Sequence, residues 1–156
     1  MAKRNLSADV LTALAGRRLA TAESLTGGGI GQTLTSVSGA SAVYAGGIIS
    51  YTNEVKHKVL GVPVEILDAF GAVSAPVAQA MAEGARRVLD AHVAVAVTGL
   101  AGPSGDEFGN PVGTVFIGYA DQSTAFAREY HFTGSREDVR EQTICAALKL
   151  VLEQNQ

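Results

Sequence analysis

The stretch Thr21-Ala22-Glu23-Ser24-Leu25-Thr26-Gly27-Gly28-Gly29-Ile30-Gly31 decides the expected fold of this chain. A strand-like run, residues 18–22, leads into it, and a helix-like run, residues 28–37, follows it. Hydroxyls and glycines therefore lie where a strand passes into a helix, which in an open α/β sheet is where ligands bind. Glycines let backbone N–H groups approach a ligand closely, and a helix N-terminus favours an anion.

Two well-known loop motifs do not match this stretch. A Walker A loop requires Gly-Lys-Ser/Thr after the glycines, and this chain has none there. The G-x-S-x-G motif requires a glycine two residues before the serine, whereas Ala22 and Glu23 precede Ser24. The glycines alone fit a structural turn as well as a binding site. The carboxylate of Glu23 and the hydroxyls of Ser24 and Thr26, gathered in so few residues, favour a functional site.

The composition indicates one globular domain, residues 1–156. A chain of 156 residues is long enough for a substantial core, and 47% of its residues are hydrophobic. The formal net charge is −3 at pH 7, without a long basic run. We therefore expect no nucleic-acid partner.

Cysteine usage and the start of the chain favour the cytoplasm. Cys145 is the only cysteine, so no intrachain disulfide can form, and we expect it to be a small core residue. Residues 1–6 are basic, but Ser7 and Asp9 follow where a signal peptide would be apolar. No stretch is long enough to cross a membrane, so no membrane partner is expected either.

Periodicity and turn residues predict alternating strands and helices over most of the chain. Strands are expected at residues 18–22, 44–51, 92–98, 114–119 and 126–132, and helices at residues 7–16, 28–37, 53–60, 63–70, 74–90 and 135–151. Such alternation favours a three-layer α/β/α domain. The short connection between the last two strands adds an antiparallel pair, so we expect a mixed, mainly parallel sheet of about five strands. Residues 102–111 are expected to form a mobile flap.

The stretch Thr21-Ala22-Glu23-Ser24-Leu25-Thr26-Gly27-Gly28 resembles the signature of the CinA C-terminal family, the nicotinamide-nucleotide amidohydrolases. Further segments agree in order and together span nearly the whole chain: Tyr51-Thr52-Asn53-Glu54-Val55-Lys56, Gly71-Ala72-Val73-Ser74, Thr98-Gly99-Leu100-Ala101-Gly102-Pro103 and Pro111-Val112-Gly113-Thr114-Val115. Family members usually have Cys at the position of Leu25 and often Ser at that of Thr98. Because this chain has Leu25 where other members have cysteine, the cysteine next to the serine in those members is not expected to be the nucleophile.

The resemblance implies the same α/β fold in a stand-alone form of the domain. It implies a nicotinamide-nucleotide amidase, which hydrolyses the carboxamide of nicotinamide mononucleotide to nicotinate mononucleotide and ammonia in pyridine nucleotide recycling. The partner would be a small-molecule nucleotide substrate, with no cofactor, and we expect a homo-oligomer. Two alternatives remain open: a nucleotide-binding module without catalysis, and an amidase for another small amide.

Ser24 is the expected nucleophile, and it needs a base because a serine hydroxyl is weak until its proton is removed. The sequence contexts of the three histidines favour structural or solvated roles: His57, His92 and His131. A lysine can serve when its pKa falls from ~10.4 to roughly 7–8. From spacing alone Lys56 resembles an ordinary solvated lysine, but the resemblance places it on the family's Tyr-x-Asn-Glu-x-Lys motif. Tyr51 opens that motif and is either a proton relay or a core aromatic.

The remaining candidates would bind substrate. Thr98 and the N–H of Gly99 could hold a substrate amide or an oxyanion, although Thr98 could equally cap a turn. The loop itself adds four candidates: Glu23, Thr26, Gly27 and Gly28.

Arg136 and Arg140 lie one helical turn apart and could clamp a phosphate, or form a salt-bridged surface with the glutamates beside them. Arg140 is expected to contribute more, because it lies deeper in its helix. Asp106 and Glu107 lack the His or Cys neighbours that would indicate a metal, so no metal is expected.

Overall fold

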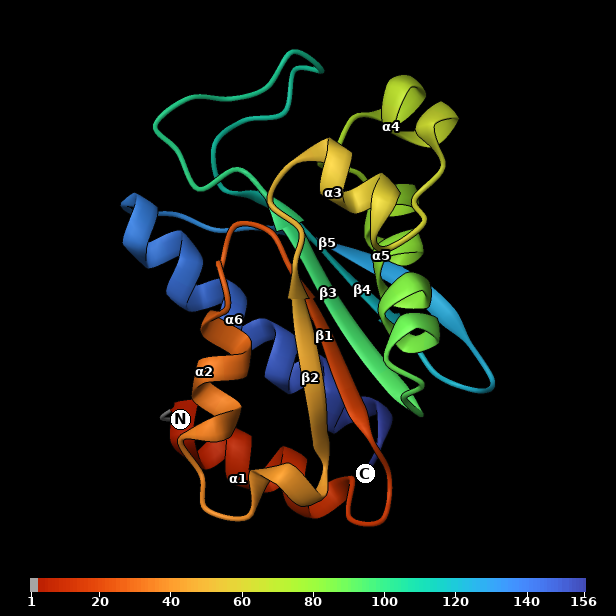
Figure 1. Ribbon diagram of the computed structural model, residues 1–156. Coiled ribbons are helices and arrows are strands. Elements are labelled where there is room, and N and C mark those ends of the chain that lie inside the picture. The colour runs from red at the N-terminus through yellow and green to blue at the C-terminus, as the bar shows by residue number, and fades with distance from the viewer. Residues whose placement is uncertain (1–2) are drawn as a thin grey trace.

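The computed structural model describes residues 3–156 (Figure 1). The helices are α1 (Lys3–Ala13), α2 (Gly29–Thr35), α3 (Asn53–Lys58), α4 (Val64–Phe70), α5 (Ala75–Val88) and α6 (Arg136–Gln154), with a short 3-10 helix, η1 (Ala40–Ala42). The strands are β1 (Leu19–Glu23), β2 (Tyr44–Ile49), β3 (Val93–Gly99), β4 (Thr114–Ala120) and β5 (Ala125–His131).

The five strands form one mixed sheet in the order β2-β1-β3-β4-β5. β1 pairs with β2 and β3 in parallel, and the pairs β3–β4 and β4–β5 are antiparallel. β4 is thus the one strand of this sheet that runs against the other four. The predicted fold class, a mixed and mainly parallel α/β sheet of about five strands, is confirmed.

Helices cover both faces of the sheet, and the sequence of β3 shows why (Figure 1). Its residues alternate Val and Ala: Val93, Val95 and Val97 pack into the core with α1, α2 and α6, whereas Ala94 and Ala96 face the core under α5. Because alternate residues of a strand point to opposite faces, this alternation makes one thick and one thin layer of core.

The thin layer brings α5 very close to its neighbours. A β-carbon at Gly84 of α5 would overlap the carbonyl of Leu60, and one at Gly118 of β4 would overlap the carbonyl of Ala78. Glycine is needed at both positions for steric reasons, since any side chain would force the backbones apart.

The element boundaries differ from expectation most at the first helix. It was expected at residues 7–16, but α1 begins by Lys3 and ends at Ala13. Ser7 therefore lies inside α1, where it is fully buried. The buried side chains of Leu6 and Val10 share one face of α1. Their packing against the core stabilises helix on both sides of Ser7, so the helix includes the polar residues from Lys3 on.

The carboxyl ends of β1, β2 and β3 meet at one edge of the sheet. Figure 1 shows α3, α4 and the long loop between β3 and β4 gathered at this end, with both termini at the other. Within residues 3–156, no helix combines the length and apolar character needed to span a bilayer.

Candidate active site

Ser24 follows directly on the last residue of β1, and its backbone is fixed on both sides. Its N–H donates to the carbonyl of Val97 in β3 at 3.1 Å, which extends the parallel ladder by one bond. Its carbonyl accepts from the N–H of Gly27 at 3.1 Å, which closes a tight turn. The side chain is buried, with 8% of the residue exposed. The turn therefore presents the Ser24 hydroxyl at the sheet edge.

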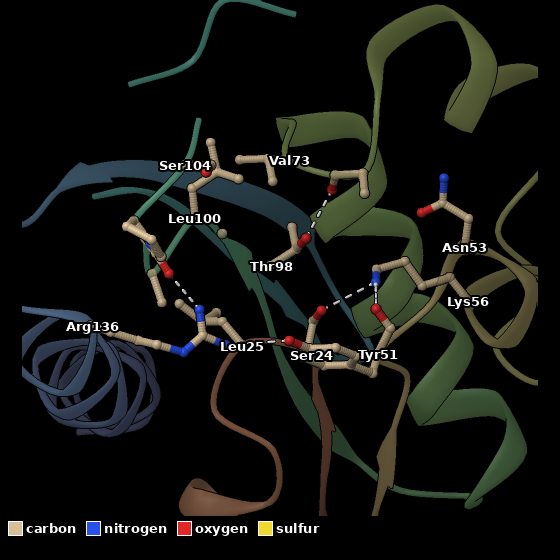
Figure 2. Close-up of a pocket in the computed structure, with 15 residues that line it drawn as sticks. Ser24, Leu25, Tyr51, Asn53, Lys56, Val73, Thr98, Leu100, Ser104 and Arg136 are labelled. Carbon is tan, nitrogen blue, oxygen red and sulfur yellow. Dashed lines mark hydrogen bonds between the residues drawn. The ribbon is translucent and has the colours of Figure 1, made fainter. Parts of the chain in front are cut away.

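Lys56 contacts this hydroxyl from α3, the helix that follows the neighbouring strand β2 (Figure 2). Its Nζ lies 3.2 Å from Ser24 Oγ and also donates to the carbonyls of Ser50, at 2.8 Å, and Tyr51, at 3.3 Å. Thr52 caps α3 by accepting from a backbone N–H, which sets where the helix begins. Only 1% of Lys56 is exposed, so its long side chain is held in one place by packing.

Burial changes the chemistry of this amine. Removal from water disfavours the charged form and lowers the pKa of Lys56 from 10.5 to about 8. Roughly a tenth of the amine is then neutral at pH 7, and about half at pH 8. A neutral amine at hydrogen-bond distance from Ser24 can accept the serine proton, which is the pairing that activates a serine without histidine.

Both side chains open into a pocket of about 390 Å³. Its walls come from the ends of several strands and from the start of the last helix. They consist of Ser24, Leu25, Tyr51, Asn53, Lys56, Ala72, Val73, residues 98–104 and Arg136. A cavity of this size fits a small ligand rather than a macromolecule.

Thr98 and Gly99, the last two residues of β3, also line the pocket, and Figure 2 shows the Thr98 side chain among the labelled lining residues. The hydroxyl of Thr98 donates to the carbonyl of Ala72 at 2.9 Å and so fixes the neighbouring wall. Its oxygen keeps its capacity to accept a further hydrogen bond. The structure thus brings both residues to the pocket, as the sequence predicts, and also gives Thr98 the alternative, structural contact.

Tyr51 lies between the Ser24–Lys56 pair and Arg136 (Figure 2). Its carbonyl accepts from Lys56, and its hydroxyl accepts from Arg136 Nη2 at 3.3 Å. The residue is 59% exposed, so it is not a core aromatic. Arg136 also donates from Nη1 to the carbonyl of Gly102, which ties the loop after β3 to α6. Two of its N–H groups are engaged, and its guanidinium faces the pocket.

Glu23 and Thr26 were expected to bind substrate, but neither lines this pocket. Both are almost fully buried. The Glu23 carboxylate accepts from the Thr26 hydroxyl at 2.6 Å and from the N–H groups of Ile30, at 2.8 Å, and Gly31, at 3.0 Å. Glu23 therefore caps the first turn of α2, since backbone donors there have no partner within the helix.

Gly27 and Gly28 also lie outside the pocket lining. Both have a positive φ, 58° and 103°, which lets the chain reverse from the tight turn into α2. The N–H of Gly27 is used by the carbonyl of Ser24. These glycines shape the loop that follows Ser24, whereas the sequence favoured them as ligand donors.

Arg140 requires the largest revision of the expected site. Its Nε donates to the carbonyl of Leu25 at 2.9 Å, its Nη2 approaches the carbonyl of Thr26 at 3.4 Å, and its Nη1 pairs with Glu137 at 3.0 Å. It does not line the pocket. Its place in α6, which favoured it as a phosphate ligand, instead sets its guanidinium against the Leu25 and Thr26 carbonyls in the loop after Ser24.

The expected flap is anchored at several points in this structure. Asn110 Nδ2 donates to the carbonyl of Val73 at 3.3 Å and to Asp106 at 2.8 Å, and the same aspartate accepts from the Asn110 N–H at 2.9 Å. The ring of Phe108 lies over Gly71, where a β-carbon would overlap it. The loop therefore forms a closed unit that rests on the segment between α4 and α5.

The three histidines, His57, His92 and His131, lie outside the lining of the described pocket. Across residues 3–156, no group of three or more His, Cys, Asp or Glu side chains is arranged to hold a metal ion.

Several pocket residues carried no signal in the sequence. Leu25, Asn53, Val73 and residues 100–103 lie in the motifs of the family resemblance without an expected contact to substrate, and residues 102–104 were also expected as part of the flap. Apolar wall residues resemble core residues in composition, so only their position after a strand end could have indicated them.

The fold and site define an α/β protein with a buried serine–lysine pair at the carboxyl edge of its parallel strands. The family model of the CinA C-terminal domain matches residues 3–155, and the chain belongs to that family.

Relatives and solved structures agree with this membership. A CinA-like protein of Geobacter sulfurreducens is 47% identical over 85% of this chain, and one of Anaeromyxobacter dehalogenans is 49% identical over 87%. The chain spans about a third of the length of these curated relatives, 32% and 33%.

Among crystal structures, a CinA superfamily protein of Klebsiella pneumoniae has a TM-score of 0.96 and 34% identity, covering 99% of this chain and 98% of its own. A competence/damage inducible protein of Agrobacterium tumefaciens has a TM-score of 0.95 and 38% identity, covering 99% and 96%.

Proposed function

We propose that this protein hydrolyses the carboxamide of nicotinamide mononucleotide, giving nicotinate mononucleotide and ammonia. The observation that carries the proposal is the 3.2 Å contact between Lys56 Nζ and Ser24 Oγ, at the wall of a small-ligand pocket. This arrangement supplies a nucleophile, and burial lowers the pKa of its base to about 8. The substrate comes from the family resemblance, and the pocket volume and Arg136 are compatible with it.

In the first half of the reaction, neutral Lys56 takes the proton of Ser24 as its oxygen bonds to the amide carbon. The carbonyl oxygen becomes an oxyanion, which needs a donor nearby. The N–H of Leu25 is suited to this role: Leu25 lines the pocket, directly follows the nucleophile, and its N–H has no acceptor within residues 3–156. Protonated Lys56 then gives its proton to the amide nitrogen, the C–N bond breaks, and ammonia leaves.

In the second half, water hydrolyses the ester formed on Ser24. Lys56 is neutral again after ammonia has left, so it takes a proton from the water as the water attacks the ester carbon. The proton returns to the Ser24 oxygen when the ester bond breaks, and the product is released as the acid, which loses its proton to water to give the carboxylate. One lysine thus acts as base and acid in each half, which suits an amine whose pKa lies near the working pH.

Arg136 is the proposed ligand for the phosphate of this substrate. Its guanidinium faces the pocket and is held by the carbonyl of Gly102 and the hydroxyl of Tyr51. Both contacts are made by neutral oxygen acceptors, so the charge of the guanidinium is not neutralised by either of them. A fixed cation with N–H groups to spare is suited to a phosphate oxygen.

Incubation with nicotinamide mononucleotide tests the proposal directly. Purified wild type and Ser24→Ala protein are incubated at pH 8, ammonia is assayed, and nicotinate mononucleotide is separated by chromatography. Equimolar products from the wild type alone support the proposal. Binding without turnover by the wild type would instead favour a nucleotide-binding module, and turnover of simple amides but not of the nucleotide would favour a different amidase.

A further inference from the structure

The Arg140 guanidinium reaches from α6 to the turn that carries the nucleophile, more than a hundred residues earlier in the chain. It donates from Nε to the Leu25 carbonyl at 2.9 Å, and its Nη2 lies 3.4 Å from the Thr26 carbonyl. These are the two residues immediately after Ser24. The remaining terminal nitrogen, Nη1, pairs with Glu137, whose side chain is 67% exposed. Arg140 therefore contacts the backbone of this loop without lining the pocket.

The two carbonyls need such a donor. Leu25 and Thr26 occupy the central positions of the turn closed by Ser24 and Gly27, and they are 5% and 1% exposed. A buried carbonyl without a partner is costly, because water cannot replace the lost hydrogen bond. The Thr26 carbonyl also accepts from Gly29, but the Leu25 carbonyl has Arg140 as its one donor within residues 3–156.

An opposite charge, the Glu23 carboxylate, also holds this loop. The Glu23 carboxylate accepts from Thr26 and from two N–H groups of α2. The Glu23 carboxylate thus binds hydrogen-bond donors of the loop and of α2, and the Arg140 guanidinium binds carbonyl acceptors of the loop. Ser24 itself has few constraints on its side chain, since Lys56 is the contact its hydroxyl makes. Its position relative to Lys56 is thus set by the backbone of this loop.

We propose that Arg140 is a positioning residue for the reaction at Ser24, acting through the carbonyls of Leu25 and Thr26. This inference rests on the proposed function and assigns Arg140 no contact with substrate. Without the guanidinium, the Leu25 peptide rotates to find another donor. Because the backbone angles of Leu25 change with this rotation, the preceding Ser24–Leu25 peptide shifts as well, which moves the serine hydroxyl and the N–H of Leu25, the proposed oxyanion donor. The chemical step is impaired, while the binding surfaces formed by Arg136 and Thr98 remain.

Steady-state kinetics on nicotinamide mononucleotide separate this role from substrate binding. Arg140→Ala is expected to lower kcat by about a hundredfold and to change KM by less than about threefold. Arg140→Lys, whose single ammonium can reach one carbonyl, is expected to recover part of kcat. The matched control is Glu137→Gln, which removes the salt bridge but keeps both carbonyl contacts, and it should behave as the wild type. A kcat within about twofold of wild type for Arg140→Ala, or a rise in KM alone, overturns the inference.

A crystal structure of the Arg140→Ala protein gives a readout that does not depend on the substrate. The Ser24 Oγ to Lys56 Nζ separation, 3.2 Å in the wild type, should increase or become variable as the Leu25 peptide turns. An unchanged loop contradicts the inference. If Arg140→Ala does not fold, Arg140→Lys serves for both measurements. If the wild type lacks turnover, the proposed function fails, whereas the loop comparison still decides whether Arg140 positions Ser24.

Discussion

Lys56 and Ser24 are 32 residues apart in sequence and meet because the strands that precede them, β2 and β1, are parallel neighbours. β1 ends one residue before Ser24, and the pairing of Glu23 with Ile49 places the end of β2 beside it. The N–H of Ser50 donates to the Glu23 carbonyl at 2.9 Å, which continues this pairing beyond the strand. The register of β1 against β2 therefore fixes the distance between base and nucleophile.

Ser24→Ala is expected to lower kcat by roughly three orders of magnitude or more, because it removes the hydroxyl that contacts the Lys56 amine. Binding of the substrate, measured by calorimetry, should be largely kept. The matched control is Ser104→Ala, a second serine that lines the same pocket without contacting Lys56. Near wild-type turnover of the Ser24→Ala protein would exclude covalent catalysis by this residue.

The pH profile should report the neutral fraction of Lys56. Because burial lowers its pKa to about 8, kcat/KM is expected to rise about tenfold per pH unit below pH 7 and to level off above pH 8. Lys56→Arg should be nearly inactive at every pH, since a guanidinium cannot give up its proton. A fully active Lys56→Arg protein would remove Lys56 as the base and turn attention to Tyr51.

Lys56 should also leave a signature in stability. Its pKa is about 8 in the folded protein and 10.5 as the reference for the unfolded chain, so between these values the unfolded chain binds more protons. The free energy of unfolding then rises with pH in this window, by up to about 3 kcal/mol. Below pH 8 the folded protein carries the full cost of burying the charged Lys56 amine.

Denaturant titrations of wild type and Lys56→Met at pH 7 to 10.5 would show this as a changing gap between the two proteins. The difference cancels the titration of other groups, which both proteins share. Parallel stability curves would mean that the pKa of Lys56 is not lowered in the folded state.

Arg136→Ala is expected to raise KM for nicotinamide mononucleotide by about tenfold or more, because a charge-assisted hydrogen bond contributes roughly 1.5–3 kcal/mol. Nicotinamide riboside lacks the phosphate, so its KM should change little. Parallel kinetics on the two substrates make this comparison. Equal effects on both would show that Arg136 acts through the Gly102 carbonyl, as a support for the loop, rather than through the phosphate.

The fold was predictable from sequence because its signals are local. Alternating strands and helices, glycine-ended helices and the apolar run of β3 each appear in a short window. The first helix was misplaced because its start depends on packing of Leu6 and Val10 rather than on a capping residue. Helix ends are set by such tertiary contacts as well as by propensity.

The site was only partly predictable. Ser24 and Lys56 were found through motifs, and Thr98, Gly99 and Arg136 do line the pocket with them. Sequence spacing could not separate Arg136 from Arg140, because residues one turn apart share a helix face. The difference arises from the approach of α6 to the sheet edge, where one turn faces the pocket and the next faces the Leu25 carbonyl.

The close approach of α5 has a consequence for mutational scanning. Gly84 and Gly118 will tolerate substitution as poorly as Ser24, although neither is near the chemistry. Variants at the two glycines should lose cellular abundance, whereas Ser24→Ala should accumulate normally and lose only turnover. A scan that records abundance beside activity will therefore separate the positions that lose abundance from those that lose only turnover. The positions that lose only turnover will outline the active site without any bound ligand.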